Sequence, residues 1–262
     1  MAQIDIDYNN VDFIPGGADA PDRWSADARS FRETEAAIGR ARLNVAYGAG
    51  ERQKLDLFYP AGKPKGLVDF VHGGYWLRFD RAFWSHFSAG FTEAGWVVAL
   101  PSYTLAPKAR ISGMTREIAA ALDCAADMVA GPIRLCGHSA GGHLVARIGC
   151  KDVMCHAKPR VQNIVPISPV SDLRPLLETA MNATLQLDPD EATTESPVLH
   201  PAPDIPTTVW VGAEERPVFL DQARWLAEAW ETPLRIDPGR HHFDVIDGLR
   251  TAGSPLIQTI LN

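Results

Sequence analysis

The stretch Ile133-Arg134-Leu135-Cys136-Gly137-His138-Ser139-Ala140-Gly141 contains the pattern G-x-S-x-G directly after an apolar run. Helix-forming residues follow it, so the order is strand, Gly-flanked serine and helix. This order would hold Ser139 on a strained turn with its hydroxyl exposed at the end of the strand. Gly137 and Gly141 lack the Cβ atoms that would collide with backbone at such a turn. A structural serine in a Gly-rich loop is the simpler alternative, and the rest of the chain must decide between them.

The composition is that of an ordinary globular protein. The chain has 262 residues, of which 46% are hydrophobic and 22% charged, and this length suits one domain with a continuous sheet. A net charge of −7 argues against nucleic acid as a partner, because phosphate binding needs a basic face. No apolar run is long enough for a transmembrane helix, and no membrane association is expected. The acidic N-terminus does not resemble a secretory signal, so we expect a cytoplasmic protein.

The four cysteines, Cys124, Cys136, Cys150 and Cys155, are expected to be reduced. Cys124 and Cys136 fall in a predicted helix and a predicted strand, where they act as small core residues. The spacing of Cys150 and Cys155 does not fit C-x-x-C, and no pair of histidines completes a zinc set. The residues therefore predict no metal site.

Apolar segments of strand length alternate with helical segments along most of the chain. Predicted strands cover residues 53–60, 66–71, 96–100, 133–136, 164–167, 207–211 and 234–236. Predicted helices cover residues 80–94, 115–129, 143–149 and 217–230 and the C-terminal segment. This alternation is typical of an α/β fold with a mostly parallel central sheet and helices on both faces. Within residues 80–94 and just before them, the spacing of Phe79, Phe83, Trp84 and Phe87 indicates the core face of a helix.

Two segments depart from the alternation, although the whole of residues 1–262 is expected to form a single domain. Residues 1–40 are predicted to form an extended arm and then a helix over residues 23–37, with Asp22 as its N-cap. Residues 171–206 are long, Pro-rich and weakly periodic. Segments of this kind in compact domains are usually functional, so we expect a small cap-like insertion that walls the site.

The candidates for a base are His241 and His242, which follow the last predicted strand. Neutral imidazole can accept the Ser139 proton near neutral pH. We favour His242, because Phe243 and Val245 beside it can pack that stretch against the final helix. Two solvent-facing loop histidines are the alternative interpretation.

The candidates for an orienting acid are Glu214 and Glu215, which follow another apolar strand. One carboxylate would accept the Nδ1–H of the histidine and thereby set its tautomer. Two solvated loop glutamates are the alternative, and Asp204 and Asp237 are less well placed substitutes. The residues themselves do not distinguish Glu214 from Glu215.

The stretch His72-Gly73-Gly74-Tyr75-Trp76 is the candidate for an oxyanion hole. Adjacent glycines allow backbone N–H groups to approach a ligand without side-chain collision. Gly73 and Gly74 would act with the N–H of Ala140, which lies at the start of the helix after Ser139. Tyr75 and Trp76 would either add an aromatic substrate-binding surface or serve only in packing.

These motifs resemble the α/β-hydrolase fold, and more narrowly the kynurenine formamidase (arylformamidase) branch of the esterases and lipases. The matching stretches are HGGYW at residues 72–76, GHSAGGH at 137–143, SPVSDL at 168–173 and HFDVI at 242–246, together with Tyr8-Asn9-Asn10 and Arg23-Trp24 near the N-terminus. In that family the acid lies two residues before a proline, and Glu215-Arg216-Pro217 aligns with this position. The resemblance therefore favours Glu215 as the acid, with Glu replacing the usual Asp.

The resemblance implies a serine hydrolase that cleaves a small amide or ester through an acyl-enzyme and needs no metal or organic cofactor. N-formylkynurenine is the family substrate, and related members are general carboxylesterases or thioesterases. The replacement of Asp by Glu leaves a second hypothesis, a non-catalytic member of the fold that binds a ligand or a protein. For the enzyme we expect a small-molecule amide or ester as partner, no nucleic acid, and a homodimer as one option.

Overall fold

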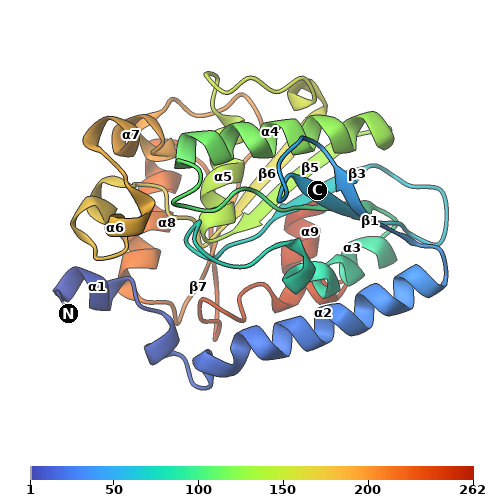
Figure 1. Cartoon of the computed structure of the whole chain (residues 1–262), viewed down its shortest axis with the longest axis horizontal. Coiled ribbons are helices and arrows are strands. Elements are labelled where there is room, and N and C mark those ends of the chain that lie inside the picture. Colours follow the sequence, from blue (N-terminus) through green and yellow to red (C-terminus); the bar gives the residue numbers. More distant parts are fainter. Residues whose placement is uncertain (1) are drawn as a thin grey trace.

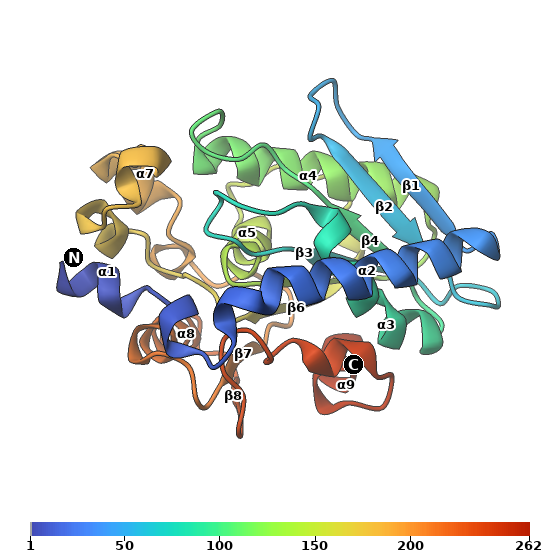
Figure 2. The ribbon, with the colours of Figure 1, turned by 60° about the horizontal axis from the view of Figure 1, so that its bottom comes forward.

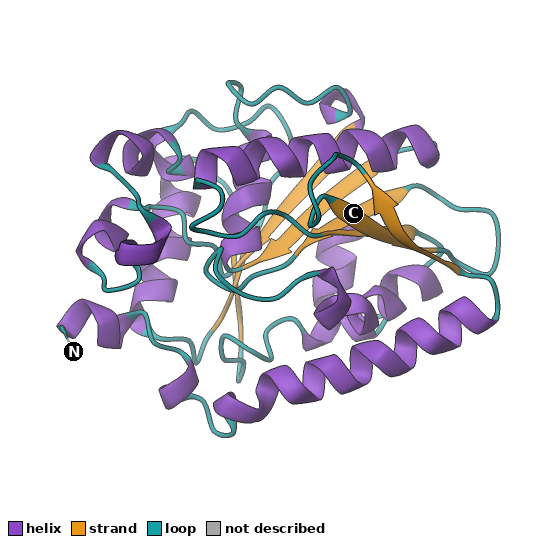
Figure 3. Cartoon of the chain, viewed as in Figure 1, coloured by secondary structure: helices purple, strands orange, loops and turns teal. Residues whose placement is uncertain are grey.

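In the computed structural model, which describes residues 2–262, one twisted sheet of eight strands forms the centre of the protein. Figure 3 shows this sheet enclosed by helices. The strands lie side by side in the order β1-β2-β4-β3-β5-β6-β7-β8. The pairs β1–β2 and β2–β4 are antiparallel, and every other neighbouring pair is parallel. The bounds are β1 Ala41–Ala46, β2 Lys54–Phe58, β3 Leu67–Val71, β4 Val97–Pro101, β5 Ile133–His138, β6 Val161–Ile167, β7 Val209–Gly212 and β8 Leu234–Asp237.

Helices cover both faces of the sheet (Figure 1). On one face the apolar sides of α4 (Ile111–Met128), α5 (Ala140–Gly149) and α8 (Pro217–Ala229) pack on the strands. On the other face lie α2 (Ala20–Ala37), α3 (Ala89–Glu93) and α9 (Pro255–Leu261), with the 3-10 helix η3 (Arg81–Ser88). The central strands β3 and β5 are buried along their whole length. Strands that are buried along their whole length are expected where a parallel sheet is covered on both faces.

The order of the strands determines where the candidate residues meet. Strands β3, β5, β6, β7 and β8 are parallel neighbours, so their carboxyl ends lie along one edge of the sheet. The Gly73-Gly74 loop follows β3, Ser139 follows β5, Glu215 follows β7 and His242 follows β8. Ligands in open α/β sheets bind at this edge. The topology therefore brings together residues as far apart in the sequence as Gly73 and His242, a separation of 169 positions.

Most predicted elements occur within a few residues of the expected bounds, with three differences. Strand β1 was not predicted, although every second residue in it is less exposed, as expected for an edge strand. The predicted helix over residues 80–94 is divided into η3 and α3, and the Asp80 side chain accepts a hydrogen bond from Ala82 N at the start of η3. Asp22 is not an N-cap, because α2 begins at Ala20 and places Asp22 in its first turn, after Pro21.

Residues 2–19 are a further difference, because they are not extended as predicted. They form the short helix α1 (Gln3–Asp7) and the 3-10 helices η1 (Val11–Phe13) and η2 (Gly17–Asp19), which lead into α2. Figure 2 shows this arm passing in front of α8 and below the short helices near α7. Polar contacts hold it there: the Tyr8 hydroxyl accepts from Gln222 Nε2 at 2.9 Å, and Asp5 Oδ1 accepts from Ala180 N at 2.7 Å. These helical turns could not be predicted from local sequence patterns, because contacts with distant residues stabilise them.

Residues 171–206 contain short helical pieces in place of one regular element. These are η5 (Arg174–Glu178), α6 (Asn182–Leu185), α7 (Pro189–Thr194) and η6 (Pro197–Leu199). The segment lies beside α1 and α8 at one end of the sheet (Figure 1). Elsewhere, as here, no helix in the described part of the chain has the length and apolar character to cross a bilayer.

A buried carboxylate joins the helical layer containing α2 to the edge of the sheet. Asp56 on β2 is completely buried and forms ion pairs with Arg32 of α2 and with Arg81, whose Nε lies 3.1 Å from Asp56 Oδ1. The backbone N–H of Asn44 on β1 also donates to Oδ1, at 2.7 Å. A buried charge of this kind is tolerated only because several donors surround it. Asp56 thereby fixes the position of α2, which carries Trp24 toward the site.

A second buried carboxyl, Asp69 at the middle of β3, has no such partners. It is 1% exposed, and its Oδ1 makes no hydrogen bond to any described residue. Burial raises its pKa from 3.8 to about 8, because a low-dielectric surrounding disfavours the charged form. The folded protein therefore keeps this proton between about pH 4 and pH 8, where the unfolded chain has lost it.

We expect stability to fall as pH rises through this interval, because the folded state binds more protons there than the unfolded state. The variant Asp69→Asn removes the titrating group and keeps the shape. The difference in melting temperature, variant minus wild type, should therefore increase from pH 5 to pH 8. Thermal unfolding of both proteins at several pH values measures the difference, and parallel curves would show that Asp69 does not titrate in this way.

Candidate active site

Ser139 occupies the turn between β5 and α5 in a conformation that residues with a Cβ seldom adopt. Its backbone angles are φ 57° and ψ −116°. A non-glycine residue in such a conformation persists only where the surrounding structure holds it, and such residues concentrate at functional sites. The Ser139 N–H donates to the carbonyl of Ile167 on β6 at 2.8 Å, and its own carbonyl accepts from His143 N at 3.0 Å. The turn is thus tied to the neighbouring strand and to α5.

Close backbone contacts explain the two glycines around the serine. A Cβ at Gly137 would lie 2.4 Å from the carbonyl oxygen of Gly141. A Cβ at Gly141 would lie 2.0 Å from the oxygen of Val71, at the end of β3. Both separations are far shorter than atomic contact allows, so α5 can start this close to the sheet only when both positions lack a side chain.

The imidazole of His242 lies between Ser139 and Glu215. His242 Nε2 is 3.0 Å from Ser139 Oγ, and His242 Nδ1 is 2.6 Å from Glu215 Oε2. A carboxylate only accepts hydrogen bonds, so Nδ1 carries the proton and Nε2 presents its lone pair to the serine hydroxyl. All three residues are nearly buried, with exposed fractions of 3% for Ser139, 3% for His242 and 6% for Glu215.

Glu215 is the acid that the structure brings to the histidine. The turn after β7 packs on the segment before His242, because Glu214 N donates to the carbonyl of Arg240 at 2.8 Å. The same contact leaves the Glu214 side chain exposed to solvent. Of the other acidic candidates, Asp204 is exposed and pairs with Lys151 at 2.9 Å, whereas no hydrogen bond or ion pair between the described residues joins Asp237 to His242.

Two donors hold the other oxygen of Glu215. Its Oε1 accepts from the backbone N–H of Gly212 at 3.0 Å and from the hydroxyl of Ser168, which follows β6. The carboxylate thus has donors on both oxygens, which offsets the cost of burying its charge. Ser168 lies in the SPVSDL motif, but the sequence analysis did not propose it as a site residue. Nothing in the motif shows where the Ser168 hydroxyl points.

The residue before the serine, His138, packs against His242 and forms a hydrogen bond with it. Its Nε2 donates to the backbone carbonyl of His242 at 2.8 Å, and the two rings lie 4.7 Å apart. Burial is the main cause of a pKa well below the ordinary value of 6.5, so His138 stays neutral. His241, the alternative base, faces another way: its Nδ1 accepts from Phe243 N at 3.1 Å and lies 3.1 Å from Asp244 Oδ1.

Backbone N–H groups of the predicted oxyanion hole lie near Ser139. A Cβ at Gly73 would be 3.0 Å from the Cβ of Ser139, which shows how closely the loop after β3 passes the serine. Gly74 has φ +114°, a conformation that favours glycine. Among the hydrogen bonds between residues 2–262, none uses the N–H of Gly73, Gly74 or Ala140. These groups are therefore available to a ligand oxygen, and Ala140 N–H also lies at the positive end of α5.

The loop that carries these glycines is held by His72. Its Nδ1 donates to the carbonyl of Gly73 at 2.8 Å, and its ring stacks on Tyr103 with centroids 4.6 Å apart. The Tyr103 hydroxyl donates to the carbonyl of His72 at 3.0 Å. Burial lowers the pKa of His72 to about 4, so the ring is neutral and acts in packing and hydrogen bonding.

A cavity of about 520 Å³ opens at Ser139 and His242. Its aromatic wall comes from Trp24 of α2, with Phe79 and Phe243, whose rings pack on Trp24 at 6.1 and 5.2 Å. The predicted substrate residue Tyr75 lines the cavity, and its hydroxyl donates to the carbonyl of Tyr8 at 2.6 Å. A cavity of this size holds a small ligand with an aromatic ring.

The second aromatic substrate candidate, Trp76, lies elsewhere. It is completely buried, does not line the cavity and packs edge-on against His143 at 5.1 Å. The packing alternative therefore holds for Trp76, because positive φ values at Tyr75 and Trp76 turn the chain and direct the two side chains apart. The expected helix face does not include Phe79, which precedes η3 and lines the cavity. The sequence analysis did not propose Trp24 and Phe243 as cavity residues, because the residues they contact are distant in the sequence.

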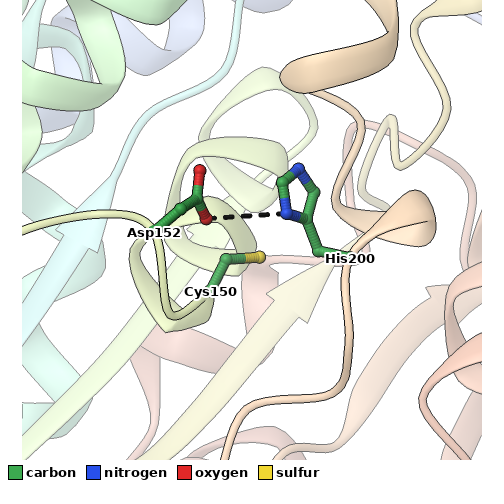
Figure 4. Close-up of side chains that lie close together, drawn as sticks. All are labelled: Cys150, Asp152 and His200. Carbon is green, nitrogen blue, oxygen red and sulfur yellow. Dashed lines mark ion pairs between the residues drawn. The ribbon is translucent and has the colours of Figure 1, made fainter.

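A separate cluster of Cys150, Asp152 and His200 lies at the other end of α5 (Figure 4). Its candidate ligand atoms lie within 4.8 Å of one another. However, both oxygens of Asp152 accept from the buried Arg147 guanidinium, at 3.1 and 2.7 Å. His200 Nδ1 lies 3.5 Å from Asp152, as the dashed line in Figure 4 marks. A cation here would compete with Arg147, so the cluster is better described as an ion-pair network than as a metal centre.

Comparison with known proteins agrees with this arrangement. The profile of the α/β-hydrolase fold family matches residues 68–232. Kynurenine formamidase of Salmo salar is 30% identical over 247 residues, which cover 87% of this chain and 84% of that protein. The crystal structure of a proposed thioesterase from Silicibacter sp. TM1040 is 50% identical with a TM-score of 0.97, and 100% of each chain is covered.

A more distant structure, esterase B from Lactobacillus rhamnosis, has a TM-score of 0.69 at 18% identity over 93% of both chains, which shows a shared fold. The α/β architecture predicted from the sequence is thereby confirmed. These similarities show that the chain belongs to the α/β-hydrolase fold family and is a hydrolase of the arylformamidase and esterase type.

Proposed function

We propose that Ser139, His242 and Glu215 form the catalytic triad of a serine hydrolase that cleaves a small aryl amide or ester. The observation that carries this proposal is the continuous chain of contacts from Glu215 Oε2 through His242 to Ser139 Oγ, at 2.6 and 3.0 Å. The distances are within the range in which a base can take the proton of a nucleophile. The aligned relatives support the same class of reaction.

In the first half of the reaction, Ser139 Oγ attacks the substrate carbonyl carbon while His242 Nε2 takes the hydroxyl proton. The negative charge that develops on the carbonyl oxygen is stabilised by the free N–H groups of Gly73, Gly74 and Ala140. One such donor typically contributes about 3 kcal/mol to the transition state. When the intermediate collapses, the imidazolium of His242 protonates the leaving amine or alcohol, and Ser139 retains the acyl group as an ester.

In the second half, water attacks this ester and gives its proton to His242. Collapse of the second intermediate returns the proton to Ser139 Oγ and releases the acid. Glu215 accepts the Nδ1–H of His242 and stabilises the imidazolium that forms in each half. Its glutamate side chain is longer than the usual aspartate, and the Ser168 hydroxyl and Gly212 N–H position it.

The proposed substrate class is the aryl formamide, of which N-formylkynurenine is the example implied by relatives named kynurenine formamidase. The aromatic wall of Trp24, Phe79 and Phe243 suits the aryl portion of such a substrate. The cap-like role of residues 171–206 belongs to this proposal, because Ala180 and Met181 line the same cavity. The cytoplasmic location and the homodimer that were expected from the sequence are also part of this proposal.

Thioester hydrolysis is the second candidate, because thioesterase activity has been proposed for the 50% identical protein from Silicibacter sp. TM1040. The same triad and N–H groups would serve this reaction, since a thioester carbonyl also passes through a tetrahedral oxyanion. The leaving group is then a thiolate and needs less protonation by His242.

The nucleophile is tested with Ser139→Ala. We expect the variant to lose at least about a thousandfold in kcat on p-nitrophenyl acetate or an aryl formamide, because no other group can form the acyl-enzyme. A fluorophosphonate probe should label the wild type and leave the correctly folded variant unlabelled. Unchanged turnover would remove Ser139 from the mechanism, and an unlabelled, inactive wild type would favour a non-catalytic binding protein.

The acid is tested with Glu215→Gln, with Glu214→Gln as a matched control. The amide can keep the contact but not the charge, so the histidine tautomer and the imidazolium lose their support. We expect kcat to fall about a thousandfold to ten-thousandfold in Glu215→Gln. Glu214→Gln should stay within about twofold of wild type, since Glu214 faces solvent. Equal effects of both substitutions would contradict the assignment.

The substrate class is tested by comparing kcat/KM for N-formylkynurenine, short acyl esters of p-nitrophenol and acyl thioesters. We expect the aryl formamide to give the highest value, because its ring fits the aromatic wall and its formyl group fits beside Ser139. Substituting Trp24 by Ala should reduce kcat/KM for the formamide more than for an acetate ester. A higher value for the thioesters would favour the second candidate.

A further inference from the structure

Ser168 is a second buried serine at the carboxyl edge of the sheet, and its hydroxyl transfers no proton in the proposed mechanism. It follows β6 directly and is completely buried. Its backbone has φ 47°, a conformation that residues with a Cβ seldom adopt. Pro169 comes next, although a residue before proline ordinarily has an extended backbone. Strain of this kind persists only where the surrounding structure holds it, and it concentrates at functional sites.

Two hydrogen bonds hold Ser168 in this conformation. Its backbone N–H donates to the carbonyl of Trp210 on β7 at 2.7 Å, and its hydroxyl donates to Glu215 Oε1. The first bond joins the residue to the strand that leads to Glu215, and the second ends on the carboxylate itself. The strained turn after β6 therefore directs a hydroxyl across the sheet edge to the acid that follows the next strand.

The carboxylate of Glu215 has to bridge two sets of donors. Its side chain is completely buried, and its Oε2 lies 2.6 Å from His242 Nδ1. Its Oε1 accepts from the Ser168 hydroxyl and from the N–H of Gly212, at 3.0 Å for the latter. A glutamate side chain has one more rotatable bond than aspartate, so more conformational freedom is lost when it is held in one orientation. Donors on Oε1 select the orientation in which Oε2 faces the imidazole.

The backbone cannot compensate for a shorter acid. The Glu214 N–H donates to the carbonyl of Arg240 at 2.8 Å, and a Cβ at Gly212 would lie 2.2 Å from the same oxygen. The turn after β7 is therefore already in contact with the segment that carries the histidine. An aspartate at position 215 would withdraw the carboxylate by one carbon–carbon bond, about 1.5 Å. It could not reach the imidazole and the Ser168 hydroxyl together.

We propose that Ser168 is a positioning residue that holds the Glu215 carboxylate toward His242, and that this contact makes glutamate the required acid at position 215. The inference rests on the proposed hydrolase function and adds a residue to it. Ser168 acts through the acid alone, because it does not line the cavity and no hydrogen bond among residues 2–262 joins it to Ser139. Ser168 and Glu215 form a matched pair in place of the aspartate that the resemblance implies.

The requirement for glutamate is tested with Glu215→Asp, which keeps the charge and shortens the side chain. We expect kcat on p-nitrophenyl acetate to fall about a hundredfold, because a displacement of about 1 Å in a catalytic site can have an effect of that size. KM should change less than about twofold, since the cavity is untouched. A kcat equal to that of the wild type would overturn the requirement.

The hydroxyl is tested with two variants and a control. Ser168→Ala should lower kcat about tenfold and leave KM within about twofold of wild type. Ser168→Gly loses the same hydroxyl but suits the positive φ, so it should lose as much in kcat while unfolding at a higher temperature than Ser168→Ala. Ser171 is equally buried in the same motif and donates to the carbonyl of Gln222 at 2.6 Å. Ser171→Ala should keep kcat within about twofold of wild type.

A double variant shows whether Ser168 acts through the acid. In the Glu215→Gln background the carboxylate charge is gone, so adding Ser168→Ala should lower the remaining kcat less than about twofold. A further tenfold loss in that background would mean that Ser168 acts elsewhere. A loss in Ser171→Ala as large as that in Ser168→Ala would attribute the effect to the loop and not to the hydroxyl. Either result would overturn the proposal.

A measurement without substrate tests the positioning directly. The proton between His242 Nδ1 and Glu215 Oε2 lies in a short hydrogen bond, so its NMR signal is expected far downfield of the amide protons. Its absence in His242→Gln identifies it. We expect this signal to move upfield or to broaden in Ser168→Ala and to stay in place in Ser171→Ala.

Failure of the proposed function is seen separately, as wild-type turnover that is absent or does not depend on Ser139. The NMR signal still tests the contact between Ser168 and Glu215 in that case, because it needs no turnover. An unchanged signal in folded Ser168→Ala would overturn the positioning role whether or not the protein is a hydrolase.

Discussion

The close approach of α5 to the end of β3 is the constraint on which the site depends. Gly141 touches the carbonyl of Val71 so closely that any side chain would be excluded. This contact sets where α5 begins, and therefore where Ala140 N–H points and how the Ser139 backbone is strained. It also places the Gly73-Gly74 loop beside the serine, because that loop continues directly from Val71. One close contact between backbone atoms thus positions both Ser139, the proposed nucleophile, and the N–H groups that would receive the oxyanion.

The second half of the site depends on a polar contact between two loops. The turn after β7 and the segment before His242 are joined by a backbone hydrogen bond between Glu214 and Arg240. A Cβ at Gly212 would lie 2.2 Å from the Arg240 oxygen, so this contact too requires a glycine. The longer reach of glutamate is accommodated because Glu215 is anchored from behind by Ser168 and Gly212. These two donors keep the Glu215 carboxylate at the histidine.

The cavity is built from other parts of the chain than the loops at the carboxyl edge of the sheet. Its walls come from the N-terminal arm, from α2 and from the short helices near Ala180, and they are assembled by long-range contacts such as Tyr8 with Gln222. Periodicity could not reveal these contacts, and it suggested an extended arm where helical turns occur. In the sequence, Trp24 falls in a predicted helix and Phe79 beside a predicted helical core face. They form a wall of the cavity only because both rings and that of Phe243 pack together in the folded protein. The cavity thus lies in the part of the molecule that local sequence patterns describe least well.

The local pattern of residues was enough to predict the alternating strands and helices, the turn at Ser139, and a short list of candidate acids and bases after the later strands. It could do so because apolar periodicity and glycines at tight turns are local properties of the chain. The contact between the Glu215 carboxylate and His242, the burial of Trp76 in the core and the place of Tyr75 at the cavity are seen only in the folded protein. Neighbouring residues in a loop have nearly the same sequence context, and their side chains diverge according to which distant strand or helix packs against each one.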